Sequence, residues 1–276
     1  AGTFTYGTST LVMTGSSKTI TYKGNEAISN LTISGTITLK ETYDGGARFR
    51  LNGNLTVDAS KTLASNGSEY LSMDDSGRTI TINNTATGIS NLNKFQFTHT
   101  SGTINLPACT TKRLDIDGNG GTTKLTGAVT ITDACTIDYG TLDIDSQTLT
   151  LGASSADMNM TVSNNGTVNI TGGTIKMGTS GTSSGIVFNN HMTLSATNAT
   201  LEGYSSSNRA KCKFRVENDL ELVGGTAKNL EIVSDSDTHQ LTVIGHVINC
   251  TTNDTDDKFI QWHHTLDTQQ LLDADE

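Results

Sequence analysis

The chain has 276 residues, a formal net charge of −10 at pH 7, and a composition that is 34% hydrophobic and only 5% aromatic. The acidic balance argues against binding to nucleic acid or to anionic membranes, because both need a basic protein surface. With 28 glycines and one proline, the chain lacks the large side chains of a broad globular core and the prolines of a proline-rich linker.

The start of the chain, Ala1-Gly-Thr-Phe-Thr-Tyr6, has no initiator methionine and alternates in polarity at once. We therefore expect a mature chain whose signal peptide has been removed, and an extracellular or cell-surface location. No run of apolar residues is long enough to cross a bilayer, so no membrane span is expected.

Short apolar-x-apolar triplets recur along the chain, with Thr, Asp, Asn or Lys between the apolar residues. This alternation predicts half-buried β-strands, because successive side chains of a strand point to opposite faces. Clusters of Gly, Asn, Ser and Asp separate the triplets and predict turns. In chain order, the triplets include Leu31/Ile33, Ile37/Leu39, Leu114/Ile116, Val129/Ile131, Leu142/Ile144, Leu149/Leu151, Val168/Ile170, Ile175/Met177 and Leu220/Leu222.

A near-repeat in the middle of the chain indicates how these strands are arranged. Ala108-Cys-Thr110 followed by Leu114-Asp-Ile-Asp117 returns as Ala134-Cys-Thr136 followed by Leu142-Asp-Ile-Asp145. Such a period marks units that bury their apolar faces only by stacking on one another. We therefore predict an all-β fold, a single-stranded parallel β-solenoid (β-helix) of irregular coils over residues 1–252. Coils of roughly 20 to 28 residues give on the order of 10 to 13 coils, and a strand spacing of about 4.8 Å gives a rod roughly 50 to 60 Å long.

The cysteines lack the spacings of a metal site. Cys109 and Cys135 stand at matching positions of successive predicted coils, so a disulfide between them is one interpretation. The other is a ladder of two thiols packed as small hydrophobic side chains. Cys212 and Cys250 are a possible second pair, and they could also stay unpaired or link two subunits.

Four aspartates follow the same repeat and are expected to point outward: Asp115, Asp117, Asp143 and Asp145. If the coils are in register, these carboxylates lie close together, and a calcium ion could relieve their repulsion. The alternative is a solvated acidic face, which is favoured because the chain has no calcium-binding loop motif. Calcium is the one possible cofactor that the sequence suggests.

Paired carboxylates on a β-helix face could also cleave polysaccharides. The chain has few aromatic residues for such a site and none of the common nucleophile or nucleotide-binding motifs. Asp74-Asp75 and the Arg48/Arg50 pair are the next candidates, and we interpret both as ordinary surface. The isolated histidines are interpreted as surface or turn residues: His99, His191, His239 and His246.

Asparagine is frequent in sequons for N-glycosylation, although the high Ser and Thr content produces most of these by chance. Asparagine also suits the tight corners of parallel solenoids, where side-chain amides can form ladders. The candidate glycosylation sites are Asn30, Asn54, Asn66, Asn83, Asn159, Asn165, Asn169, Asn198, Asn249 and Asn253.

Composition shifts at the end of the chain, where residues 253–276 carry seven acidic residues against one lysine. This segment is interpreted as either a cap on the last coil or an assembly strand. Its apolar residues Phe259, Ile260 and Trp262 form a strand-like run. At the other end, the run from Thr3 to Met13 alternates without a capping helix. An uncapped strand edge pairs readily with another chain, so self-association through either end, by strand addition or end-to-end stacking, is expected.

The stacked coils Ile33-Ser-Gly-Thr-Ile-Thr-Leu39 and Val168-Asn-Ile-Thr-Gly-Gly-Thr-Ile-Lys-Met177 resemble those of β-helical surface proteins. These include bacterial adhesin passenger domains, phage tail spikes and the repetitive envelope or sheath proteins of some prokaryotes. The resemblance covers about residues 10–250 and implies an extracellular structural or adhesive role. It carries over no catalytic residue.

We therefore expect a non-enzymatic structural subunit of an extracellular filament, sheath or surface layer. Its main partner would be another copy of itself, with glycans as a further possibility. The alternative function is a carbohydrate-binding or polysaccharide-degrading β-helix of the tail-spike or lyase kind. A third possibility is a fragment of an adhesin stalk.

Overall fold

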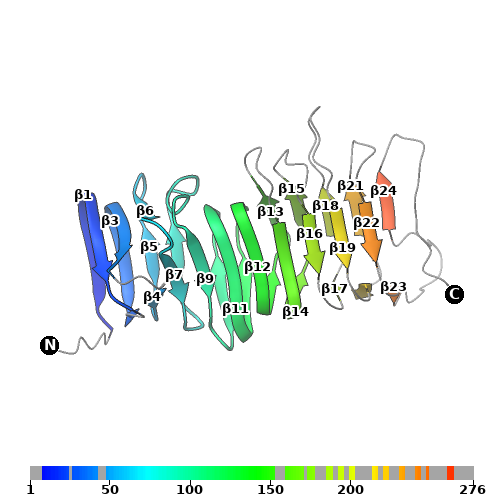
Figure 1. Ribbon diagram of the computed structural model, residues 1–276, viewed down its shortest axis with the longest axis horizontal. Helices are drawn as coiled ribbons and strands as arrows, with labels where there is room; N and C mark the ends of the chain where they lie inside the picture. The colour runs from blue at the N-terminus through cyan, green and yellow to red at the C-terminus, as the bar shows by residue number, and fades with distance from the viewer. Residues whose placement is uncertain are drawn as a thin grey trace. The chain divides into compact units, whose positions relative to one another are not determined.

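The computed structural model describes the backbone of residues 8–24, 27–42, 48–152, 159–170 and 173–177, and beyond these of the strands from β16 to β24. Side chains are described as far as Ile175, except those of Asn159 and Asn164. The described elements are strands without any helix, and their pairings are parallel (Figure 1). This arrangement confirms the predicted parallel β-solenoid. Within the described part of the chain, no helical segment has the length and hydropathy needed to cross a bilayer.

The chain forms two compact units, Ala1–Val129 and Thr130–Glu276. The first unit contains two parallel sheets. One consists of β1 (Thr10–Tyr22), β3 (Asn30–Glu41), β5 (Leu55–Val57) and β8 (Ile80–Ile82), with β6 (Thr62–Ser65) on the second half of β3. The other consists of β2 (Ala27–Ile28), β4 (Arg48–Leu51), β7 (Tyr70–Met73), β9 (Lys94–Phe97) and β11 (Cys109–Leu125), with β10 (Thr103–Leu106) also on β11.

The second unit repeats the same principle in three series of parallel strands. The first series is β12 (Val129–Asp143), β14 (Asn159–Asn169), β16 (Gly185–Phe188), β19 (Lys213–Val216) and β22 (Gln240–Val243). The second is β13 (Thr148–Leu151), β15 (Thr174–Met177), β18 (Ala199–Glu202), β21 (Leu230–Val233) and β24 (Ile260–His263). The third is β17 (Met192–Ser195), β20 (Leu220–Val223) and β23 (Val247–Ile248).

Apolar columns run through the stacked strands and form the core. Leu31 pairs with Leu55 and Leu55 with Ile80, so the same side of each strand carries an apolar residue in successive coils. Leu31 and Leu55 have no exposed surface, and Ile80 is 6% exposed. Each coil thus covers the apolar side chains of its neighbour, and this burial is the main favourable contribution to folding.

The register advances by a variable number of residues per coil. The step is 19 residues between Phe95 and Leu114 and 31 between Ala199 and Leu230. This range is wider than the expected 20 to 28, because only the strands are held in register while the connections between them vary in length. The expected coil number and rod length concern the whole chain and stay predictions.

Asparagine side chains link successive coils at one corner of the first unit. The backbone N–H of Asn54 donates to the side-chain Oδ1 of Asn30, and the backbone N–H of Thr79 donates to the side-chain Oδ1 of Asn54, each over 2.8 Å. Each of these side chains binds the backbone of the next coil, which is the kind of asparagine ladder that we predicted at the corners of the solenoid. The side chains of Asn30 and Asn54 therefore have a structural role.

Candidate functional site

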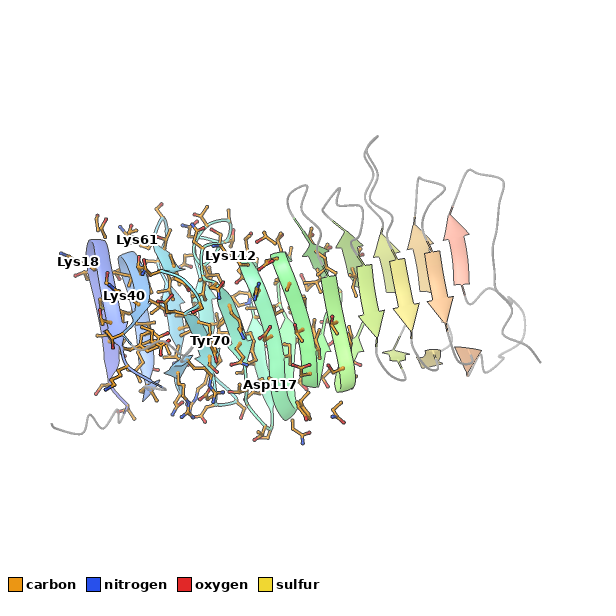
Figure 2. All side chains as sticks on the ribbon, in the orientation of Figure 1. Lys18, Lys40, Lys61, Tyr70, Lys112 and Asp117 are labelled. Carbon is orange, nitrogen blue, oxygen red and sulfur yellow. The ribbon has the colours of Figure 1, made fainter. Side chains whose placement is uncertain are left out.

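In the first unit, charged and polar side chains that pair with one another lie on the outer face of the sheet β4-β7-β9-β11. We call this surface the polar face, and it consists of Arg50, Tyr70, Ser72, Asp74, Lys94, Gln96, Thr98, Asp115 and Asp117. The strand register builds it: Arg50 pairs with Ser72, Ser72 with Gln96, and Gln96 with Asp115. Tyr70 lies on β7 and Asp117 on β11 (Figure 2). The side chains alternate with the core residues of the same strands, which explains why they face outward.

Asp74 is the centre of the polar face. Its carboxylate accepts hydrogen bonds from Ser72 Oγ at 2.6 Å and from Thr98 Oγ1 at 2.7 Å. The guanidinium of Arg50 donates to the same carboxylate and forms an ion pair with it. The Asp74 side chain is only 9% exposed, against 38% for Arg50. The carboxylate is thus anchored by three side chains from three adjacent strands or their ends.

These partners determine the charge of Asp74. Desolvation by burial raises the pKa of its carboxyl, but the hydrogen bonds from Ser72, Thr98 and Arg50 and the charge of Arg50 outweigh it, so the net pKa lies below the usual value. The group is therefore ionised at neutral pH. A general acid in polysaccharide hydrolysis needs the opposite shift.

Other charges of the polar face are also paired across the register. Lys94 Nζ lies 2.9 Å from Asp115 Oδ2 and 4.5 Å from the centre of the Tyr70 ring. Nε2 of Gln96 donates to Asp117 over 3.4 Å, whereas the buried Oε1 of Gln96 has no hydrogen-bond partner. The face is therefore a mutually paired network in which one amide oxygen is unsatisfied.

The interpretation of Asp74 as ordinary surface was wrong, because its side chain is only 9% exposed, whereas its partner Arg50 lies on the surface as interpreted and is 38% exposed. The two residues are 24 positions apart, which is about one coil, and the register brings them together with Ser72 and Thr98. Sequence reasoning missed the network because the register was assigned only near the central repeat. The sequence did contain a signal for this contact, because Arg50 and Asp74 carry opposite charges and are separated by about one coil.

The aspartates proposed for calcium divide between the two units. Asp115 and Asp117 have the protein partners described above, and the carboxylate of Asp143 accepts a hydrogen bond from the amide of Asp145 over 3.2 Å. Among the described residues, no group of three or more His, Cys, Asp or Glu side chains is placed to hold a metal ion. The structure adds no support to the calcium site, which stays a prediction.

Cys109 and Cys135 are both buried thiols in this structure. Burial raises the pKa of Cys109 to about 12, so its thiol stays protonated at neutral pH and is a poor nucleophile. Because the two cysteines belong to different units, their pairing stays a prediction. Cys212 and Cys250 lie outside the described residues.

His99 is a buried residue, so its interpretation as a surface or turn residue was wrong. It is 2% exposed, and its Nε2 donates to the carbonyl oxygen of Thr122 over 3.1 Å, while Nδ1 has no hydrogen-bond partner. The glycine-rich part of β11 packs directly on it, because a Cβ atom at Gly121 would lie 2.6 Å from Cδ2 of His99. Desolvation lowers the pKa of His99 more than the bond to Thr122 raises it. Sequence reasoning missed this contact because it depends on glycines that leave space for the ring.

The predicted glycosylation sites differ in their surroundings. Nδ2 of Asn30 donates to the carbonyl oxygen of Thr8 over 3.2 Å, and a glycan on this nitrogen would disturb that bond. Asn66, Asn83 and Asn165 are exposed, and Asn169 is half-buried. The side chain of Asn159 is not described, and three further candidates lie outside the described residues: Asn198, Asn249 and Asn253. Glycosylation stays a prediction at all of these positions.

The predicted assembly residues lie at the end of the second unit. Ile260 and Trp262 belong to β24 and are in register with Leu230 and Ile232 of β21, whereas Phe259 lies outside the described residues. The strand-like run is thus paired with a strand of its own chain on one side. The predicted boundary near residue 252 lies outside the described residues, and the role of residues 253–276 stays a prediction.

A comparison of the chain with protein-family models, with curated proteins and with solved structures found no match. The fold and the contacts of the described residues are therefore the basis for the functional proposal.

We predict that Asp74→Asn destabilises the protein by about 1 to 3 kcal/mol, because it removes the charge from a buried carboxylate with three donors. Asp75→Asn is the matched control. Asp75 is half exposed and pairs with Arg78 over 3.0 Å, and an exposed pair of this kind contributes at most about 1 kcal/mol. Urea unfolding of both variants measures the difference. Equal losses of stability would show that the network around Asp74 is no stronger than a surface ion pair.

We also predict that His99 makes the protein less stable at acidic pH. Its folded-state pKa is lowered, so below about pH 6.5, the ordinary histidine value, the unfolded chain takes up a proton that the folded chain does not. Stability is therefore complete above this pH and decreases as the pH falls, by at most about 1.4 kcal/mol per pH unit. His99→Gln keeps a donor for Thr122 but does not titrate. Melting temperatures between about pH 8 and pH 5 should decrease less in this variant, whereas parallel curves would contradict the prediction.

Proposed function

We propose that this chain is a structural subunit that assembles through the exposed edge strand β1. The supporting observation is an apolar column that is left open at this strand. Leu11 of β1 is in register with Leu31 of β3, yet Leu11 is 37% exposed while Leu31 and Leu55, farther along the column, have no exposed surface. The position that a neighbouring strand covers elsewhere is uncovered at β1.

The backbone of β1 supports the same proposal. β1 extends over 13 residues and pairs with β3 along one side, and no described strand pairs with its other side. Val12, on the opposite face of the strand, is 53% exposed. A long edge strand with unpaired N–H and C=O groups and apolar side chains is a template for the addition of another strand.

The chemistry of the polar face favours a structural role over the alternative of carbohydrate binding or cleavage. A sugar would be expected to use polar side chains and the face of an aromatic ring. Here Arg50, Asp74, Lys94 and Asp115 are paired with one another, and Lys94 covers one face of the Tyr70 ring. The ionised Asp74 carboxylate has no proton to give as a general acid, and the protonated thiol of Cys109 is a poor nucleophile. We propose an extracellular filament, sheath or surface layer as the setting for the assembly.

We predict that Leu11→Lys reduces self-association, because any strand added to β1 would have to bury the charge in the apolar column. Thr19→Lys is the matched control, since Thr19 is an exposed residue of the same strand. Light scattering over a range of concentrations measures the mass. We expect a concentration-dependent assembly for the wild type and for Thr19→Lys, and a monomer for Leu11→Lys. An unchanged mass of Leu11→Lys, with its melting temperature preserved, would exclude β1 as the joint.

A further inference from the structure

The free edge of β1 is divided into an open half and a blocked half. The pairing of β1 with β3 is regular from Thr10 to Gly15 and shifts between Gly15 and Lys18. Gly15 has a φ of 88° and Ser17 a φ of 55°, so a β-bulge with two left-handed residues interrupts the strand here. Such a bulge bends a strand and ends regular pairing on its free side.

Lys18 reinforces the block. It is in register with Ile37, which has no exposed surface and pairs with Leu63 in the next coil. Lys18 thus holds a position of the apolar column, but it is exposed and lies at the free side of β1 (Figure 2). A charged residue in a core-facing position is a known protection of edge strands. Regular pairing is therefore possible along Thr10–Thr14, which we call the open segment.

The open segment is complementary to itself. Leu11 and Met13 lie on the core-facing side, in register with Leu31 and Ile33, while Val12 lies between them on the other face. In an antiparallel pair of two open segments centred on Val12, Leu11 of each copy lies beside Met13 of the other. Each apolar column is then covered by an apolar residue, as it is within the solenoid. Isologous contacts of this kind are the most common in homo-oligomers.

Geometry favours this antiparallel arrangement over a parallel one. Because β3 occupies one edge of β1, a parallel pair joined through the two free edges would turn one copy about the strand axis, and the core-facing sides of the two strands would then point in opposite directions. In the antiparallel pair, each Lys18 is six residues beyond the axis on opposite sides, so the two ammonium groups are roughly 40 Å apart at about 3.4 Å per residue.

We propose that the occupant of the β1 edge is β1 of a second copy of this chain, paired antiparallel over Thr10–Thr14 about a twofold axis at Val12. This inference rests on the proposed function and names the partner at the same site. The paired segment is short, so the association is weak and depends on concentration. The bulge and Lys18 restrict the partner to the open segment.

Disulfide cross-linking of Val12→Cys tests the arrangement. Directly opposite residues of an antiparallel pair have Cα atoms about 4.5 to 5.5 Å apart, within the range of disulfides. Thr14→Cys is the matched control, because Thr14 would lie opposite Thr10, and the two introduced cysteines would be roughly 13 Å apart. Under mild oxidation, we expect a covalent dimer for Val12→Cys on a denaturing, non-reducing gel, and no covalent dimer for Thr14→Cys or for the wild type with its four natural cysteines. Adding Leu11→Lys to Val12→Cys should abolish the dimer.

Two results would overturn the inference and are distinguishable from a failure of the proposed function. Equal cross-linking of Val12→Cys and Thr14→Cys would show that the contact has no defined register. The absence of a Val12→Cys dimer, while Leu11→Lys still dissociates the assembly, would show that another strand occupies the edge, such as a head-to-tail neighbour. In that second case the structural role stands and the twofold joint is wrong.

Discussion

The fold depends on one requirement, that every coil has its apolar column covered by the coil on either side. A short strand such as β5 contributes only two buried apolar side chains, Leu55 and Val57, which is too little to form a core by itself. Stacking in register solves the problem, because Leu31, Leu55 and Ile80 then cover one another. The parallel pairing of neighbouring strands thus provides partners for the backbone N–H and C=O groups and also buries the apolar side chains.

The same register also arranges what lies outside the core. Residues one coil apart become neighbours, so the corner asparagines Asn30 and Asn54 reach the next coil, and Arg50 reaches Asp74. The polar face is therefore a consequence of stacking as much as of composition. Its charges are paired with one another, which suits a surface that stabilises the solenoid.

The sequence was sufficient to predict the fold because alternation and the central repeat report directly on burial. Leu114, Val129, Leu142 and Leu149, all expected in the core, have no exposed surface. The contacts of the outer face were harder to predict, because they require the number of residues in each coil, and this number varies with the connections. His99 shows another limit, since its burial depends on the space that Gly118 and Gly121 leave above it. The open half of β1 could not be separated from the blocked half without the backbone angles of Gly15 and Ser17.

At β1 the apolar column is left uncovered on one side, and we propose that a strand from another copy covers it. Hydrogen exchange followed by mass spectrometry at increasing protein concentration tests this claim directly, because the amides of Thr10–Thr14 that face the free edge lack a described partner strand. We expect their exchange to slow as the concentration rises, while exchange around Lys18 changes little. Rapid exchange of the open segment at every concentration, in a sample whose mass nevertheless increases, would contradict the proposal.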